Sequence, residues 1–323
     1  MIVVARHRAE LSIALAIAGL GLVLAIRAPG FFVAGNLLDV LLATLPVLIA
    51  AIGATLVILA GEIDISVGSI FAVCSVTAGV LAVAGVPLPL VVLIAPLVGA
   101  LLGAINGALV AWLSLPSIVV TLATMVAWRD ALRWITQGAW VQGLPAGFQW
   151  LGLSQASYPV AALIVTAGLA LAILRGLTQV PAGRAIYATG SNAEAARLAG
   201  IDTRRVRFWT FAAAGALAGL AALLNAARFS QIPPNTGLGL EMQVIAAVVV
   251  GGAAITGGRG SLAGTILGVV LLGMLGPALT FLGVSASWER AFQGAIILVA
   301  VGVDALRARR ATTMVPRREP ARV

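Results

Sequence analysis

The sequence contains about ten apolar runs, most of them close to twenty residues long, with short polar stretches between them. A helix needs roughly 20 apolar residues to cross the bilayer core, which is about 30 Å thick. Only 10% of the residues are charged and 61% are hydrophobic, against about 25% and about 45–50% in soluble domains. The predicted fold class is therefore an all-α polytopic membrane protein.

The runs predict about ten transmembrane helices, with eight to ten as the expected range because some could be broken or re-entrant. They lie at residues 10–27, 37–60, 65–85, 88–113, 117–136, 156–176, 208–227, 242–257, 261–283 and 288–306. The first run is too long for a signal peptide and has no small-residue cleavage site. We expect a single transmembrane domain over residues 1–306 and a basic, disordered tail over residues 307–323.

Arginine placement predicts the orientation. All 20 basic residues are arginine, and most gather in three segments. These are Arg6 and Arg8 before the first span, Arg184, Arg197, Arg204, Arg205 and Arg207 in the 177–207 loop, and Arg307, Arg309, Arg310, Arg317, Arg318 and Arg322 in the tail. The positive-inside rule places all three segments, and so both termini, in the cytoplasm. An even number of spans is then required, and ten satisfies this.

Missing residue types exclude several functions. Without lysine the chain has neither a P-loop nor a Schiff-base site, so any ATP that drives it is hydrolysed by another chain. One histidine, His7, and one cysteine, Cys74, cannot form a His/Cys metal cluster and argue against a membrane enzyme. The net charge of +9 does not form a basic face interleaved with aromatics, so membrane lipid is an expected partner and nucleic acid is not.

One segment places two acids among apolar residues. Its polar and small positions are Gly61, Glu62, Asp64, Ser66, Gly68 and Ser69. Carboxylates at membrane depth are costly and mark either a function or a satisfied cap. We favour a structural break at which Asp64 caps the next helix while Ser66 and Ser69 satisfy its first amides. Two alternatives stay open, a paired general acid and base, and the coupling carboxylates of an ion-driven secondary transporter.

Charges also occur in the 117–136 run, at Arg129, Asp130 and Arg133, next to Trp128 and Trp134. Tryptophans at a span end are typical of the membrane interface, so anchoring is the favoured interpretation. The alternative is a polar lining near the outer mouth of a pathway. Asp130 and Arg133 have the i,i+3 spacing of an ion pair.

The 183–201 segment predicts a short, compact helix between two spans. Ser191 or Asn192 can cap its start, Glu194 falls in its first turn, and Gly200 follows its end. Such a helix can pack into a groove on a soluble partner, although an ordinary connecting helix fits equally well.

Four stretches carry a resemblance to a known family. They are residues 61–69, close to the family's G-G-I-D-L-S-V-G-S with Glu62 and Ile65 as departures, and residues 115–124, 183–201 and 241–260. In order and spacing the chain resembles the permease subunits of ribose-type bacterial ABC sugar importers. The tract from Ile135 to Gln142 looks more like the rhamnose and autoinducer-2 members. Where family members have Arg-Gly, this chain has Arg129-Asp130.

The resemblance implies a permease of the bacterial inner membrane that imports a monosaccharide by alternating access and performs no covalent chemistry. The implied partners are ABC ATPase subunits that bind ATP and Mg, a periplasmic sugar-binding protein, and a second permease copy or paralogue. It implies ATPase coupling by Ser191, Asn192, Glu194, Ala195, Ala196, Gly200 and Ile201. Because polar side chains at membrane depth tend to face cavities, we expect Asn106, Thr121, Thr124 and Asn225 to be candidates for the substrate pathway, with an ordinary interhelical hydrogen bond as the alternative role of each.

Overall fold

The computed structural model describes residues 2–285, 288–289, 291–296, 298 and 302. About half of the tenth expected span, 288–306, and all of the expected tail, 307–323, lie outside the described residues.

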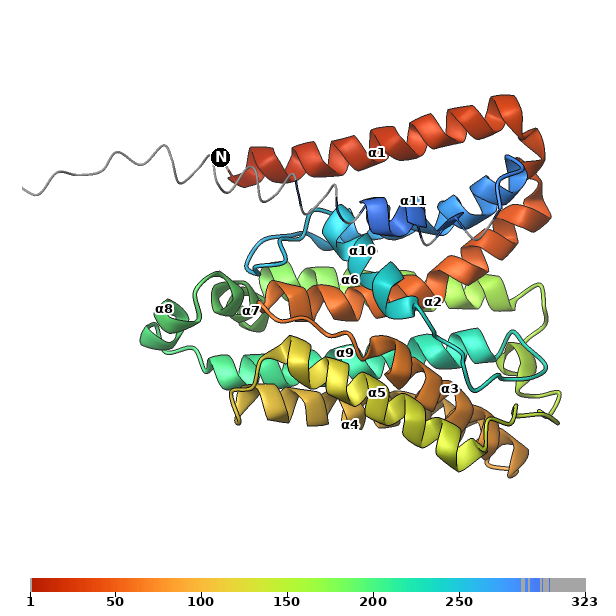
Figure 1. The fold of residues 1–323 in the computed structure, drawn as a ribbon, viewed down its shortest axis with the longest axis horizontal. Helices are drawn as coiled ribbons and strands as arrows, with labels where there is room; N and C mark the ends of the chain where they lie inside the picture. Colours follow the sequence, from red (N-terminus) through yellow and green to blue (C-terminus); the bar gives the residue numbers. More distant parts are fainter. Residues whose placement is uncertain (1, 286–287, 290, 297, 299–301, 303–323) are drawn as a thin grey trace, which may run out of the picture.

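The described part of the chain is built from helices that run side by side along the long axis of the molecule (Figure 1). The long helices are α1 (Ile2–Arg27), α2 (Ala34–Leu59), α4 (Leu88–Ala111), α5 (Ser117–Thr136), α6 (Tyr158–Gln179), α9 (Thr203–Ala226) and α11 (Leu262–Phe281). The shorter ones are α3 (Val67–Val83), α7 (Pro181–Ser191), α8 (Ala193–Leu198) and α10 (Leu240–Val250), with 3-10 turns η1 (Pro29–Phe32) and η2 (Gln149–Gly152). The described residues form no strand, only an isolated antiparallel bridge between Val141 and Ile232.

Six described helices are long and apolar enough to cross a membrane, namely α1, α2, α4, α6, α9 and α11. Helix α5 has the length but carries three charged residues within its last nine positions. The all-α polytopic membrane fold is therefore confirmed. Helices α1 to α6, α9 and α11 lie within a few residues of the expected spans, except that α1 begins earlier and α9 begins five residues early.

The expected span at 242–257 is wrong in its extent. Helix α10 has only 11 residues, too few to cross a bilayer alone, and the chain continues as a glycine-rich loop over residues 251–261. The helix ends where Gly251 packs against the backbone of Gly264 in α11 and Gly252 adopts a positive φ of +86°. The 17-residue helix α3 is also short, because the chain before it, residues 61–66, forms turns and irregular backbone instead of helix.

Burial separates an inner from an outer set of helices. The most apolar windows of α2 and α9 are 72% and 67% buried, whereas that of α1 is 11% buried. Figure 1 accordingly shows α2 and α9 in the middle of the molecule and α1 at its edge. Exposed leucines such as Leu15, Leu97 and Leu101 cover the outer helices. Such a surface suits lipid, where apolar side chains need no burial inside the protein.

Backbone contacts between glycines hold α4 against α9, as their spacing of four predicts. A Cβ on Gly99 would collide with the carbonyl oxygen of Gly215, and one on Gly103 would collide with that of Phe211. Gly219 lies in the same way against Ala95. Within α11, Gly268 faces the carbonyl of Ala247 in α10. These contacts bring the backbones of α4 and α9, and of α10 and α11, into close packing.

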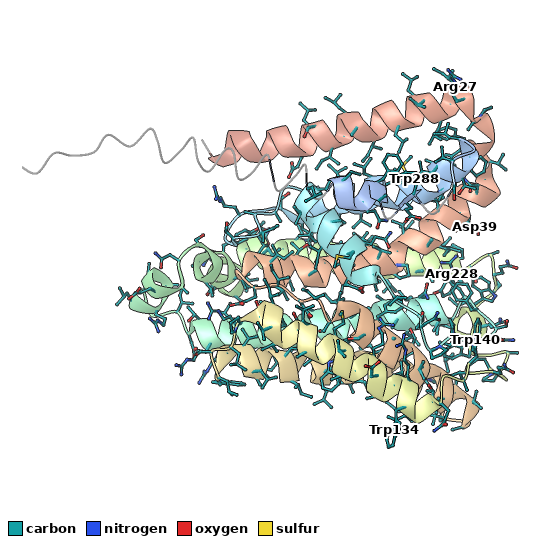
Figure 2. The ribbon with its side chains drawn as sticks, viewed as in Figure 1. Arg27, Asp39, Trp134, Trp140, Arg228 and Trp288 are labelled. Carbon is teal, nitrogen blue, oxygen red and sulfur yellow. The ribbon has the colours of Figure 1, made fainter. Side chains whose placement is uncertain are left out.

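Aromatic residues gather at both ends of the bundle. Trp112, at the end of α4, lies 4.8 Å from Phe208 at the start of α9. At the opposite end lie Trp134 and Trp140, which are 78% and 54% exposed (Figure 2). Two aromatic belts are typical of the two interfaces of a membrane-spanning protein.

Candidate functional site

The break between α2 and α3 is held by its own side chains. Oδ1 of Asp64 accepts hydrogen bonds from the backbone N–H of Ser66 at 2.8 Å and from its hydroxyl at 2.6 Å. The prediction that Asp64 caps the next helix is wrong, because the N-cap of α3 is Ser66 and Asp64 binds the N–H of that residue instead of an amide within the helix. The prediction that Ser66 and Ser69 satisfy the first amides of α3 is also wrong. Ser69 donates its hydroxyl to the Ser66 carbonyl at 2.7 Å, and the Ser66 side chain accepts no hydrogen bond from an amide of α3.

Neighbouring helices fix the same break from the side. Asn106 in α4 donates from Nδ2 to the Ser66 hydroxyl at 2.8 Å, and its Oδ1 is buried with no hydrogen-bond partner among the described residues. Thr121 in α5 donates to the Ile63 carbonyl at 3.3 Å. Thr124, one turn later, donates to the Thr121 carbonyl at 3.3 Å. These three predicted pathway residues thus lie around the break.

The two acids of the break do not form a pair. Glu62 lies 2.7 Å from Nε of Arg207 in α9, measured to its Oε1, with side-chain exposures of 10% and 29%. Asp64 is hydrogen-bonded to Ser66 instead. A general acid and base acting together would need the two carboxylates to converge, so this geometry does not favour that alternative.

Two helices, not one, form the segment between α6 and α9. Asn192 is the N-cap of α8, because its Oδ1 accepts from the N–H groups of Glu194 and Ala195 at 3.0 Å each. Ser191 is instead the last residue of α7. Gly200 ends the segment at φ +84°, where the Ile201 N–H donates to the Ala196 carbonyl at 3.0 Å. Helix α7 was not expected, although Pro181 at its first position is a usual start signal.

Helix α7 contacts both interruptions of the bundle through glycine backbone. Gly190 lies against the Leu59 carbonyl at the end of α2, and also against Gly258 in the loop before α11. The Gly258 N–H donates to the same Leu59 carbonyl at 3.0 Å. Tyr187 donates its hydroxyl to the Gly260 carbonyl at 3.1 Å. We call this contact of α7, the α2 end and the 257–260 loop the glycine junction.

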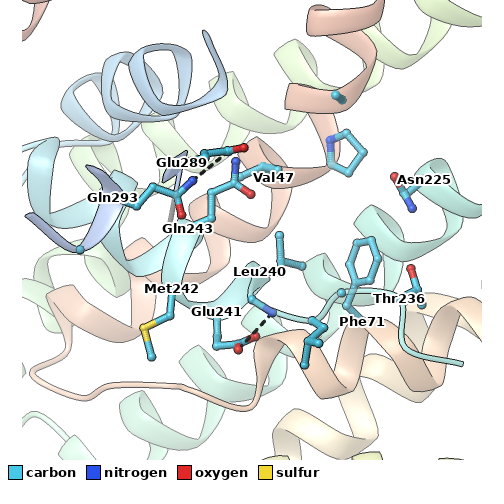
Figure 3. A pocket seen from close by; sticks show the side chains of 16 residues that line it. Val47, Phe71, Asn225, Thr236, Leu240, Glu241, Met242, Gln243, Glu289 and Gln293 are labelled. Carbon is cyan, nitrogen blue, oxygen red and sulfur yellow. Dashed lines mark hydrogen bonds between the residues drawn. The ribbon is translucent and has the colours of Figure 1, made fainter. Parts of the chain in front are cut away.

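A cavity of about 1020 Å³ lies beside α10 (Figure 3). Its lining comes from α2, α3, α9, α10, the loop before α10, and residues 289–294. The lining residues are Ala43, Pro46, Val47, Phe71, Asn225, Thr236, Gly237, Leu238, Gly239, Leu240, Glu241, Met242, Gln243, Glu289, Gln293 and Gly294. Of the four predicted pathway residues, Asn225 alone is in this lining. Glu241, Gln243, Glu289 and Gln293 were not singled out from the sequence.

The charges of α5 divide between two environments. Asp130 and Arg133 form the expected ion pair at 3.5 Å with both side chains exposed. Arg129 is only 7% exposed, and its Nη1 and Nη2 donate to the carbonyls of Thr236 and Gly237 at 3.4 Å each. Interfacial anchoring describes Asp130 and Arg133, whereas Arg129 holds the loop that lines the cavity.

One arginine outside the spans, Arg228, has a pKa that its surroundings change. Arg228, just beyond α9, is part-buried at the end of the bundle where Asp39 also lies (Figure 2). Burial lowers the pKa of its guanidinium, and Tyr158 and Asp39 partly oppose that change.

Among the described residues, no group of three or more His, Cys, Asp or Glu side chains could hold a metal ion.

Comparison with known proteins identifies the family of this chain. Residues 36–301 match the family model described as "Branched-chain amino acid transport system / permease component". The chain belongs to this family of permeases. Autoinducer 2 import system permease proteins are similar to it, with 42% identity over 253 residues for that of Yersinia enterocolitica, covering 78% of this chain and 70% of the relative. That of Salmonella typhimurium is 41% identical over 256 residues, covering 78% and 72%. No solved structure matches the chain significantly.

These findings confirm the resemblance to the permeases of ribose-type ABC importers. The chain is a multi-pass membrane permease, and one component of an ABC transport system. Both of these similar proteins are named for autoinducer-2 import, and neither name refers to rhamnose.

Proposed function

We propose that this permease carries autoinducer 2, or a neutral monosaccharide of similar size such as rhamnose or ribose, into the bacterial cytoplasm by alternating access. The observation that carries the proposal is the glycine junction, since it joins an exposed helical segment to both interruptions of the bundle. Irregular backbone at membrane depth is tolerated where it lines a cavity or is buried in protein. The interruptions directly precede α3 and follow α10, which both contribute to the cavity lining, so an element that moves α7 would act on helices that line the cavity.

In this proposal the α7–α8 segment docks on a separate ATPase that binds ATP and Mg. The residues that would form the contact are those predicted from the resemblance, Ser191, Asn192, Glu194, Ala195, Ala196, Gly200 and Ile201. Glu194, Ala195 and Gly200 are exposed, whereas Ala196 is 4% exposed and faces the protein. The chain would itself be non-catalytic and bind no cofactor, because it has no P-loop.

The same end of the molecule would face the cytoplasm. Arg184, Arg197, Arg204 and Arg205 all lie in or beside α7 and α8, and Figure 1 shows the N-terminal end of α1 on the same side. By the positive-inside rule this end is cytoplasmic. A periplasmic binding protein would then deliver substrate at the opposite end, and a second permease copy or paralogue would complete the passage.

Uptake by membrane vesicles tests the energy source. With the complete importer present, autoinducer-2 uptake should stop when ATP is depleted under an intact proton gradient. Uptake that persists would contradict the proposal and support an ion-driven transporter using Glu62 and Asp64. No observation favours that alternative, because Glu62 is ion-paired with Arg207 and Asp64 is hydrogen-bonded to Ser66.

A further inference from the structure

The described charged side chains that line the cavity are both acidic. They are Glu241 from α10 and Glu289, whose Oε1 accepts a hydrogen bond from Gln293 Nε2 at 3.0 Å (Figure 3). Arg129 is not in the lining, but its guanidinium binds the carbonyls of Thr236 and Gly237 and lies near enough to Glu241 for the two charges to attract each other. A solute in the cavity therefore meets negative charge and neutral amides.

The N-terminus of α10 is already occupied by a carboxylate of the chain itself. Oε1 of Glu241 accepts from the Gly239 N–H at 3.2 Å. A helix N-terminus otherwise attracts a phosphate or carboxylate, because its amides are free and its dipole is positive. With Glu241 in that position, an anionic solute loses the attraction and is repelled by the charge.

The second oxygen of Glu241 lacks a hydrogen-bond partner among the described residues. The residue is only 8% exposed, and Oε2 is buried without a donor. It lies against Gly68 of α3, where a Cβ would collide with it. A buried carboxylate oxygen without a donor is costly, so a group that donates a hydrogen bond there gains more than it would at a satisfied site.

Hydroxyl groups have the required chemistry. Each donates one hydrogen bond and accepts others, and the amides of Asn225, Gln243 and Gln293 offer both donors and acceptors around the same cavity. We propose that Glu241 recognises the solute in this cavity by accepting a hydrogen bond from a hydroxyl group of a neutral polyhydroxylated molecule, and that the acidic lining disfavours phosphorylated and carboxylated solutes. This inference rests on the proposed function, which supplies a neutral sugar as cargo.

The first test is uptake. In cells that contain the complete importer, Glu241→Gln keeps the shape of the side chain and removes its charge. We expect the initial rate of autoinducer-2 uptake to fall at least tenfold at equal permease levels in the membrane. Gly68→Ala, which displaces Oε2, should also lower it. Asp130→Asn removes an exposed carboxylate outside the cavity and should stay within twofold of the unsubstituted protein. Uptake by Glu241→Gln within twofold would overturn the inference.

The second test does not depend on the cargo. Gln243→Cys places a thiol in the cavity, while Cys74 is fully buried. In the assembled importer, a cationic methanethiosulfonate should modify this thiol about tenfold faster than an anionic one, relative to their rates with a free thiol, because two carboxylates lie nearby. Adding Glu241→Gln should reduce the preference at least threefold, and adding Asp130→Asn should not.

The outcomes separate the two proposals. Equal rates, an anionic preference or no modification at all would overturn the inference, since the cavity would then be neutral, positive or closed to water. Failure of the unsubstituted importer to take up autoinducer 2 would contradict that choice of cargo. The thiol reactivities would still decide whether the lining selects against anions.

Discussion

Replacing Gly190 with alanine should disturb the glycine junction directly. A Cβ there would collide with the Leu59 carbonyl oxygen and lie 2.7 Å from the Gly258 nitrogen, where ordinary van der Waals contact begins at 3.4 Å. Both neighbours are backbone atoms, so relief requires α7 to move away from α2 and the 257–260 loop. Overpacking of this kind costs about 1–3 kcal/mol. We therefore expect a lower thermal unfolding midpoint and fewer substrate molecules transported per ATP hydrolysed.

The assay compares transport and ATP hydrolysis in proteoliposomes that contain the assembled importer. Gly168→Ala is the matched control, because Gly168 is exposed in α6 and a Cβ there meets nothing within 4 Å. In a helix, glycine is less stable than alanine by about 0.5–1 kcal/mol, so the control should be neutral or stabilising. Unchanged stability and an unchanged transport-to-ATP ratio in Gly190→Ala would refute the assignment of α7 as the transmitting element.

Three further substitutions test other contacts. Arg207→Ala leaves the carboxylate of Glu62 buried without its partner, so the unfolding midpoint should fall by the equivalent of about 2 kcal/mol. This cost is below that of breaking a fully buried ion pair, because Arg207 is part-exposed. Adding Glu62→Ala should restore most of the lost stability. Gly215→Val sets a branched side chain against the Gly99 carbonyl and should cost about 3 kcal/mol, seen as a loss of monodisperse protein on size-exclusion chromatography. Ala195→Trp, at an exposed position of α8, should abolish uptake while the amount of inserted permease stays normal, and normal uptake would refute the coupling assignment.

Sequence patterns predicted the parts of this fold that depend on local chemistry. Apolar runs of about twenty residues predicted the long helices because membrane thickness sets their length. Asn192 was one of two expected caps, and the structure selects it because its side chain reaches two free amides. The spacing of four between Gly99 and Gly103, and between Gly215 and Gly219, also indicates close packing, since small residues four apart leave one helix face open to a neighbouring backbone.

The cavity and the junction could not be predicted in this way, because each depends on segments that are far apart in the chain. Nothing local distinguishes Glu241, an acid in the first turn of a helix, from an ordinary dipole-stabilising residue. Its role depends on Gly68, about 170 residues earlier, which leaves room for its carboxylate. The roles of Gly190 and Gly258 likewise depend on Leu59, because both glycines contact its carbonyl oxygen in the folded chain.

The short helices α3 and α10 connect the junction to the cavity. Helix α3 follows the 61–66 break and contributes Phe71 to the lining, while α10 precedes the 251–261 loop and contributes Leu240 to Gln243. Helix α7 contacts Leu59 just before the first interruption and Gly258 within the second, so a displacement of α7 cannot leave Leu59 and Gly258 both in place. Irregular and glycine-rich backbone bends more readily than a continuous helix, so the movement should be taken up at the breaks. We therefore expect α3 and α10, which both contribute to the cavity lining, to shift against the closely packed α4–α9 pair.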